Sequence, residues 1–390
     1  MNNKREYTQC NRCVLDTSTS LISFDKSGIC NYCNEYDKTA KETVLRPLEV
    51  RKKELDNIVS TLKKAGQGKE YDCIIGVSGG MDSSYLAVVV KELGLRPLVV
   101  HFDNGWNSEL AVKNIENLLN KLNYSLSTHV INWEEFKDLQ IAYFKASVID
   151  IEVPTDQLIF AVLFKIAKEN KINYILEGYN FRTEFGVPLD WTFERKFDLT
   201  NLKNIHKKFG KVKLKEFPTI SDSDLFLYDN IYHIKSISII NLLDFDWKGV
   251  KKMLTEKYDY TVYQYKHYES IFTRFYQGYI LPKKFAVDKR KAHLSTLVRS
   301  GFITKQEAIE ELKGPPYPLE QQANDKEYVL KKWEMSEKEF DDIMKQAPVS
   351  HGIYGYDKVS FWPKFKVRLY LIYLYKFAYP FGLKKRPVNT

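Results

Sequence analysis

The chain has 390 residues, of which 44% are hydrophobic and 28% charged, so global disorder is excluded and one or two packed domains are expected. The formal net charge of +9 favours anionic ligands such as nucleotides, nucleic acid or a membrane surface, without choosing among them. The polar N-terminus does not resemble a signal peptide, and no run of about 18 apolar residues is present. We therefore expect a cytoplasmic protein without a transmembrane segment.

Four of the five cysteines lie near the N-terminus. Cys10 and Cys13 form one C-x₂-C pair, and Cys30 and Cys33 form a second. Without export signals, metal ligation is a more natural reading of this pattern than disulfide formation. Two such knuckles can close one tetrahedral Zn²⁺ site, and because four thiolates leave no open position, we expect the zinc to be structural. Cys73 lies in an apolar run and is expected to be a small buried hydrophobe.

The next part of the chain alternates short apolar runs with helical patterns, after a first helix expected over 48–65. Four runs are typical of buried parallel strands: 72–77, 97–102, 125–131 and 173–177. Three segments between them have helical periodicity, the last with Thr155 as a possible N-cap: 83–93, 108–122 and 155–170. This alternation predicts an α/β fold with a doubly wound parallel sheet, whose ligands bind beyond the C-terminal ends of the strands.

After about residue 235 the strand pattern fades and helices are expected at 246–256, 265–279, 290–297, 304–312, 324–333 and 336–345. We therefore divide the chain into a four-cysteine zinc module (1–45), an α/β domain (46–235) and a mainly helical substrate or partner region (236–390). The tail 361–390 mixes basic and aromatic residues and contains no acidic residue. It could dock a partner, make a peripheral membrane contact or simply pack on its own domain.

The segment from Ser78 to Ser83 lies between an apolar run and a helical pattern. Its two glycines, Gly79 and Gly80, let backbone amides approach a phosphate closely, and the start of the following helix adds a positive dipole end. The serine hydroxyls can donate hydrogen bonds to phosphate oxygens, and Asp82 suits Mg²⁺. No Gly-Lys-Ser/Thr follows, so this is not a Walker A loop.

The sequence Ser78-Gly79-Gly80-Met81-Asp82-Ser83 resembles the SGGxDS motif of the PP-loop ATP pyrophosphatases, which have the adenine-nucleotide α-hydrolase-like fold. The resemblance implies that the α/β domain cleaves ATP to AMP and pyrophosphate and adenylates an oxygen of its substrate. The implied nucleotide-binding residues come from the loop and from the ends of the second and fourth strands: Ser78, Gly79, Gly80, Asp82, Ser83, Ser84, His101, Asp103, Asn104, Glu177, Gly178 and Asn180. Asp103 and Asn104 could equally form a strand-ending turn, and Glu177 could cap a helix.

Together with the cysteine module, the blocks 100–106, 177–184 and 288–295 make the chain similar to the N-acetyl sugar amidotransferase family of the WbpG and PseA type. This resemblance implies that an acetamido group on a bacterial surface sugar, of an LPS O-antigen or a nonulosonic acid, becomes an acetamidino group at the expense of ATP and ammonia. It implies Asp82, Ser78, Lys289 and Arg290 as catalytic residues, the last two clamping pyrophosphate. A solvated charge run is the alternative for that pair.

The same resemblance implies the partners. They are a nucleotide-linked N-acetyl sugar and ammonia-delivering subunits similar to the glutaminase and cyclase subunits of imidazole glycerol phosphate synthase, whereas nucleic acid is not expected. Two other functions stay open. One is a PP-loop tRNA thiolase, in which zinc knuckles and basic charge also occur together, and the other is a non-catalytic zinc-ribbon adaptor that senses nucleotide.

Overall fold

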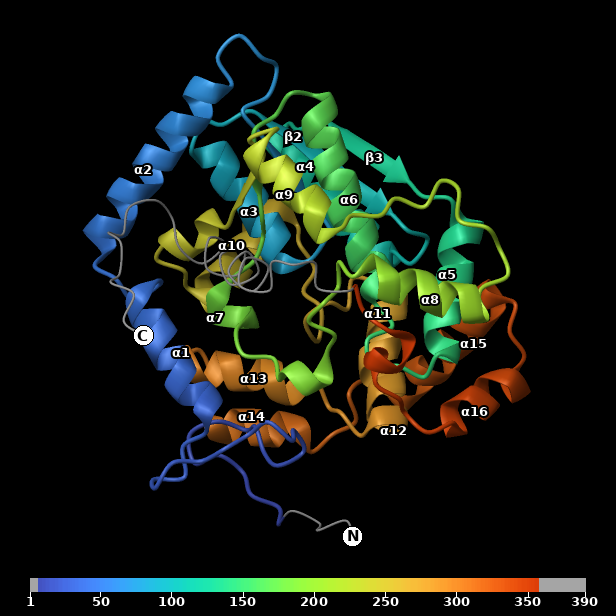
Figure 1. Ribbon diagram of the computed structural model, residues 1–390. Coiled ribbons are helices and arrows are strands. Elements are labelled where there is room, and N and C mark those ends of the chain that lie inside the picture. The colour runs from blue at the N-terminus through green and yellow to red at the C-terminus, as the bar shows by residue number, and fades with distance from the viewer. Residues whose placement is uncertain (1–5, 358–390) are drawn as a thin grey trace, which may run out of the picture.

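The computed structural model, which describes residues 6–357, is built around one five-stranded parallel sheet (Figure 1). The strands lie in the order β3-β2-β1-β4-β5, and every neighbouring pair is parallel. Their bounds are β1 Cys73–Gly76, β2 Pro97–Asp103, β3 Leu126–Val130, β4 Tyr174–Leu176 and β5 Lys235–Ile237. This is the doubly wound α/β fold that the sequence predicts, with β5 as an additional edge strand of three residues.

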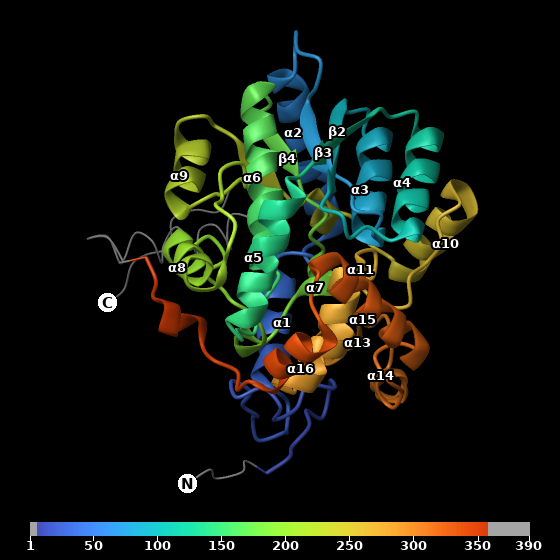
Figure 2. The same cartoon turned by 90° about the vertical axis from the view of Figure 1, so that its right-hand side faces the viewer.

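The side chains of β1 alternate between two cores, as expected for a central strand. Cys73 and Ile75 pack with α2 (Leu48–Ala65), α3 (Met81–Glu92), α4 (Glu109–Leu122) and α10 (Trp247–Tyr258). Ile74 points the other way and packs with α6 (Val153–Glu169) and α9 (Asp222–Asn230). Figure 2 shows α3, α4 and α10 on one side of the sheet and α6 and α9 on the other. Both faces of β1 are therefore buried from solvent, which explains its unbroken apolar sequence.

A third core, rich in aromatic side chains, lies beside the sheet and is built mainly from helices. Phe136 and Phe144 of α5 pack in it with Phe272, Trp333 and Phe340. The rings of Phe144 and Phe340 stack with their centroids 5.1 Å apart. The helices concerned are α5 (Trp133–Lys145), α8 (Leu199–Phe209), α11 (Ile271–Phe275), the π-helical turn η3 (Tyr276–Ile280), α12 (Leu281–Phe285), α15 (Leu319–Trp333) and α16 (Glu337–Lys345).

Several helix starts differ from the prediction, among them that of α15 at Leu319 instead of residue 324, and two differ for a clear local reason. The helix predicted over 265–279 begins only at Ile271, because the backbone before it pairs elsewhere: Ile271 N donates to the Trp106 carbonyl and Ser108 N donates to the Glu269 carbonyl. Thr155 is not an N-cap, since α6 already begins at Val153 with Pro154 in its first turn, where a missing N–H costs nothing. Because of the pairing before Ile271, residues 260–270 are irregular rather than helical, and we call them the crossing segment.

The predicted division into three domains stays a prediction. Within residues 6–357, no helix is both long and apolar enough to cross a bilayer. The tail 361–390, to which the sequence assigns a partner, membrane or packing contact, lies outside the described residues.

Candidate active site

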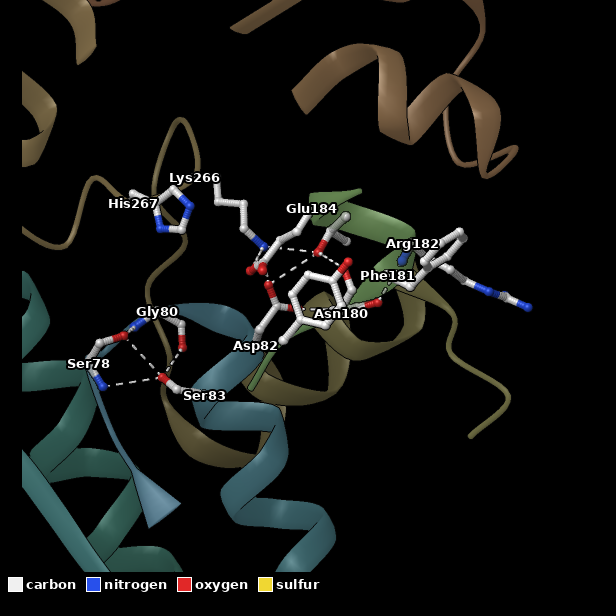
Figure 3. A network of polar contacts seen from close by, with 12 residues as sticks. Ser78, Gly80, Asp82, Ser83, Asn180, Phe181, Arg182, Glu184, Lys266 and His267 are labelled. Atoms are coloured by element: carbon white, nitrogen blue, oxygen red, sulfur yellow. Dashed lines mark hydrogen bonds and ion pairs between the residues drawn. The ribbon is translucent and has the colours of Figure 1, made fainter. Parts of the chain in front are cut away.

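The loop from Ser78 to Ser83 leaves the C-terminal end of β1 and runs directly into α3, with Gly80 as the N-cap residue (Figure 3). Gly79 has φ +82°, and a Cβ atom there would lie 2.7 Å from the carbonyl oxygen of Ala111, so only glycine fits. The Ser78 hydroxyl lies 3.2 Å from the Ser83 hydroxyl and accepts from Gly80 N at 3.2 Å. The loop thus gathers two hydroxyls and the amides of a helix N-terminus, a suitable arrangement for phosphate.

The end of β4 meets this loop at the point where the strand order reverses. A Cβ atom on Gly178 would lie 3.3 Å from the Cα of Ser83, so glycine lets the two turns pack against each other. Asn180 caps α7 (Phe181–Glu184), and its Nδ2 donates to Asp82 Oδ1 at 3.0 Å. Thr183 Oγ1 donates to Asp82 Oδ2 at 3.3 Å. The switch point of a doubly wound sheet is where its ligands bind, and here it brings together the predicted residues of β1 and β4.

Lys266, from the crossing segment, completes this cluster and was missed by the sequence analysis. Its Nζ forms an ion pair with Asp82 Oδ2 and a second one with Glu184 Oε1 at 2.9 Å, and it donates to Thr183 Oγ1 at 2.9 Å (Figure 3). Burial disfavours the charged amine, but the two carboxylates outweigh it and raise the pKa of Lys266. Burial also raises the pKa of Glu184, although Lys266 opposes that shift. One cation therefore stands between two carboxylates beside the loop.

The loop opens onto a cavity of about 430 Å³, within the range of roughly 300–1,000 Å³ typical of small-ligand sites. Ser78, Asp82 and Lys266 line one side of it. Aromatic and aliphatic side chains from α10, the crossing segment and α13 (Arg290–Arg299) also line it: Trp247, Tyr260, Val262, Tyr263, Tyr265, Leu294 and Leu297. The same part of the chain adds polar and charged side chains: Lys251, Gln264, His267, Glu269, Arg290, His293 and Glu311. The cavity therefore combines the polar loop with walls of mixed aromatic and charged side chains, which suits a nucleotide or a sugar.

The predicted residues at the end of β2 lie elsewhere. His101 Nδ1 lies 2.8 Å from the Val77 carbonyl, Asp103 Oδ1 accepts from Gly105 N at 3.0 Å, and Asn104 Oδ1 accepts from Trp106 N at 3.1 Å. These bonds shape the turn after β2, and none of His101, Asp103 and Asn104 lines the 430 Å³ cavity. Their contact with ribose stays a prediction.

Two further predicted ligands lie close to the loop, Ser84 buried and Glu177 partly buried. Ser84 is 1% exposed and lies on the first turn of α3, behind the loop. Glu177 follows β4, and its N–H donates to the Ile237 carbonyl at 3.0 Å. Burial raises the pKa of the Glu177 carboxyl to about 7. The side chain of Glu177 is therefore partly protonated at neutral pH, which makes it a weaker candidate for cation binding than Asp82.

Lys289 and Arg290, the predicted pyrophosphate clamp, lie in two different environments. Arg290 is held by Asp288, with Nη2–Oδ2 at 2.7 Å, and donates to the carbonyls of Gly314 and Pro315 at 3.1 and 3.2 Å. Its guanidinium thus ties the chain after α14 (Lys305–Leu312) to α13. Lys289 has no hydrogen bond or ion pair from its amine to any residue of the described chain, and burial together with Lys196 lowers its pKa. Of the two, Lys289 is the one without a protein partner among the described residues, but only Arg290 lines the cavity.

The four N-terminal cysteines form one compact buried cluster. Their Sγ atoms all lie within 4.8 Å of one another, with Cys10–Cys33 and Cys13–Cys30 at 3.8 Å. Zinc bound tetrahedrally at about 2.3 Å places its sulfur ligands about 3.8 Å apart, so the donor set fits Zn²⁺. Cys73 is fully buried in β1 and burial raises the pKa of its thiol, which confirms the expected structural role.

The cysteine module packs directly on α13, the helix that carries part of the cavity wall. Val14 N donates to Ser295 Oγ at 3.2 Å, and the buried Asp16 forms an ion pair with Lys291 at 2.6 Å. Lys305 Nζ, at the start of α14, donates to the carbonyl of Cys10 at 2.7 Å. A metal held by the cysteines would therefore also fix the position of α13 relative to the loop.

The chain resembles one protein family in part of its length, and one protein and two solved structures over more of it. Residues 269–368 match the family model described as LPS biosynthesis protein WbpG-like, C-terminal domain. The predicted resemblance to WbpG-like proteins is confirmed. The WbpG-like region supplies Glu269, Arg290 and His293 to the cavity, whereas the loop comes from the α/β part of the chain.

The whole-chain similarities are more distant. The uncharacterized protein MJ1599 of Methanocaldococcus jannaschii is 24% identical over 319 residues, which cover 80% of this chain and 95% of that protein. NMN synthetase from Francisella tularensis is 15% identical, with a TM-score of 0.30, over 77% of this chain and 98% of the synthetase. NAD⁺ synthetase from Burkholderia pseudomallei is 14% identical, with a TM-score of 0.26, over 59% and 95% of the two chains. At these TM-scores the likeness carries no argument, and the fold rests on the strand order.

Proposed function

We propose that the protein is an ATP-dependent amidotransferase that converts an acetamido group of a bacterial surface-polysaccharide sugar into an acetamidino group. The sugar would belong to an LPS O-antigen or be a nonulosonic acid. The observation that carries the proposal is the cavity, in which a PP-loop-like turn with Asp82 faces a wall supplied by a WbpG-like region. The turn supports ATP use, and the family description of the facing wall supports LPS biosynthesis.

In the proposed first step, ATP lies with its phosphates over the amides and hydroxyls between Ser78 and Ser83. Asp82 would hold Mg²⁺, which supplies charge neutralisation to the phosphates when bound. The acetamido oxygen attacks the α-phosphorus, pyrophosphate leaves, and an imidate adenylate forms. Lys266, fixed by Asp82 and Glu184, offers a positive charge beside the loop for the charge that develops on the phosphates.

In the proposed second step, ammonia displaces AMP. An amide oxygen is a poor leaving group, whereas AMP is a good one, and that difference is the reason for consuming ATP. Ammonia-delivering subunits, similar to a glutaminase and a cyclase, belong to the proposal because the chain's own cysteines lie in the buried four-cysteine cluster or in the buried core. The tRNA thiolase alternative is disfavoured for the same reason, since it needs an accessible sulfur-carrying thiol.

The proposal is tested with ¹⁵N-ammonium, ATP and a panel of nucleotide-linked N-acetyl sugars. At least one sugar should gain one ¹⁵N while AMP and pyrophosphate form in equal amounts. Asp82→Ala, which removes the carboxylate but keeps the loop, should form neither product. ATP binding without AMP formation for every sugar would favour the nucleotide-sensing adaptor and contradict the proposal.

A further inference from the structure

Two histidines from different elements face the same cavity as the loop. His267 follows Lys266 in the crossing segment, and His293 lies on the first turn of α13. Their ring centroids are 5.6 Å apart with an angle of 64° between the ring planes. Both residues line the cavity together with Ser78 and Asp82. Figure 3 shows the His267 ring beside Lys266 and above the loop.

The ring nitrogens of both histidines are available to a ligand. Neither ring forms a hydrogen bond with any residue in the described range 6–357. The carboxylate of Glu269 approaches His267 Nδ1 only to 4.0 Å, which is beyond hydrogen-bond reach. The His267 side chain is 39% exposed because it borders the cavity. Both rings are partly exposed to the cavity, so their unpartnered nitrogens can contact a ligand bound there.

Burial and the charges around the pair favour the neutral form of both rings. Burial, Lys266 and the neighbouring His293 and Lys289 lower the pKa of His267 well below its ordinary value. Burial and the same two lysines do so for His293. Of the carboxylates in the vicinity, Asp82 and Glu184 form ion pairs with Lys266. Glu269 Oε1 accepts a hydrogen bond from Ser78 Oγ at 3.3 Å and comes only within 4.0 Å of His267 Nδ1. A neutral imidazole offers an unprotonated nitrogen at neutral pH, and this suits a proton acceptor better than a phosphate ligand.

We propose that His267 and His293 form the proton acceptor of the nitrogen-transfer step, an inference that rests on the proposed function. The lone pair of ammonia attacks the carbon of the protonated imidate adenylate and forms a C–N bond, while the π pair of the existing C=N bond moves onto the sugar nitrogen. The adduct carries an –NH₃⁺ group, which gives one proton to an imidazole of the pair. The C–O bond to AMP then breaks, and its electron pair leaves on the AMP oxygen. The products are the amidinium, AMP and an imidazolium that returns its proton to water.

The two steps can be measured separately, which makes the proposal testable. Exchange of labelled pyrophosphate into ATP needs only ATP and the sugar, so it reports adenylation and also confirms that each variant is folded. In His267→Asn, His293→Asn and the double variant, this exchange should stay within a few-fold of wild type. Ammonium-dependent amidine formation should fall about 100-fold or more in the double variant, the usual contribution of a general base. His233→Asn is the matched control, since His233 is exposed and adopts φ +53°, which asparagine tolerates.

Hydroxylamine provides a positive test of the proton step. It is a less basic nitrogen nucleophile, and its adduct loses a proton to water readily, so it should restore turnover in the double variant. Wild-type amidine formation in the double variant would overturn the proposal. A parallel loss of exchange and amidine formation would also overturn it, because the histidines would then act in adenylation. A wild-type enzyme that forms no AMP with any sugar would contradict the proposed function itself.

Discussion

Replacing Lys266 by methionine tests the electrostatic centre of the site. The side chains of Lys266, Asp82 and Glu184 are 19%, 12% and 24% exposed, so the ion pairs are largely buried. Removing one partner of a buried pair costs about 3–5 kcal/mol, because the remaining charge is left without compensation. Since burial already raises the pKa of Glu184, proton uptake by this carboxyl relieves part of the repulsion. We therefore expect Lys266→Met to lower the free energy of unfolding by about 3 kcal/mol near pH 7.5.

The same substitution should reduce pyrophosphate exchange into ATP by about 10²–10³, the effect of losing one preorganised charge at a reacting phosphate. Adding Glu184→Gln removes the uncompensated second carboxylate. The double variant should regain at least ~1 kcal/mol of stability, within the coupling energies measured for residues in contact, while its exchange rate stays low. Urea unfolding and the exchange assay measure the two effects separately.

Lys252→Met is the control, because Lys252 is 73% exposed and its pairing with Glu256 at 3.9 Å contributes little to stability. Wild-type exchange and stability in Lys266→Met would refute the reasoning. Recovery of exchange together with stability in the double variant would show that Lys266 only holds the fold.

Three further predictions concern the metal, the pH dependence and the nitrogen source. Freshly purified protein should contain one zinc per chain by elemental analysis. Cys30→Ser should lose the zinc together with stability and ATP affinity, because the cysteine module positions α13. Iron–sulfur absorbance would instead favour the tRNA thiolase. Because the pKa of Glu177 is raised to about 7, the folded state retains a proton that the unfolded chain releases, and stability should fall as pH rises from about 4.5 to 7 by at most about 3 kcal/mol. Glu177→Gln should flatten that slope in urea unfolding, and an unchanged slope would contradict the burial argument. The isolated chain should use ammonium but not glutamine, and efficient glutamine use would show that its cysteines have been misread.

The parts of the site that are contiguous in sequence could be predicted, and the parts assembled across the chain could not. The loop is recognisable because strand, glycines and helix start follow one another, so Asp82 and its surroundings are specified locally. Asn180 could be placed near it because parallel strands bring their C-terminal ends to one edge of the sheet.

Lys266 had no comparable signal. It lies 184 positions from Asp82, in an irregular segment whose aromatic residues are spaced as in a helix. The pairing of this segment with the turn after β2 holds Lys266 in place, and that long-range contact leaves no trace in the local sequence. The roles of Lys289 and Arg290 could not be told apart for the same reason, since the carbonyls that engage Arg290 come from the chain after α14.

The central claim is that this site adenylates an acetamido oxygen. The most direct measurement uses an N-acetyl sugar labelled with ¹⁸O in the acetamido carbonyl, with ATP and ammonium, followed by mass spectrometry of the released AMP and pyrophosphate. Our account predicts one ¹⁸O in the phosphate of AMP for each amidine formed and none in pyrophosphate. Amidine formation with unlabelled AMP would contradict it.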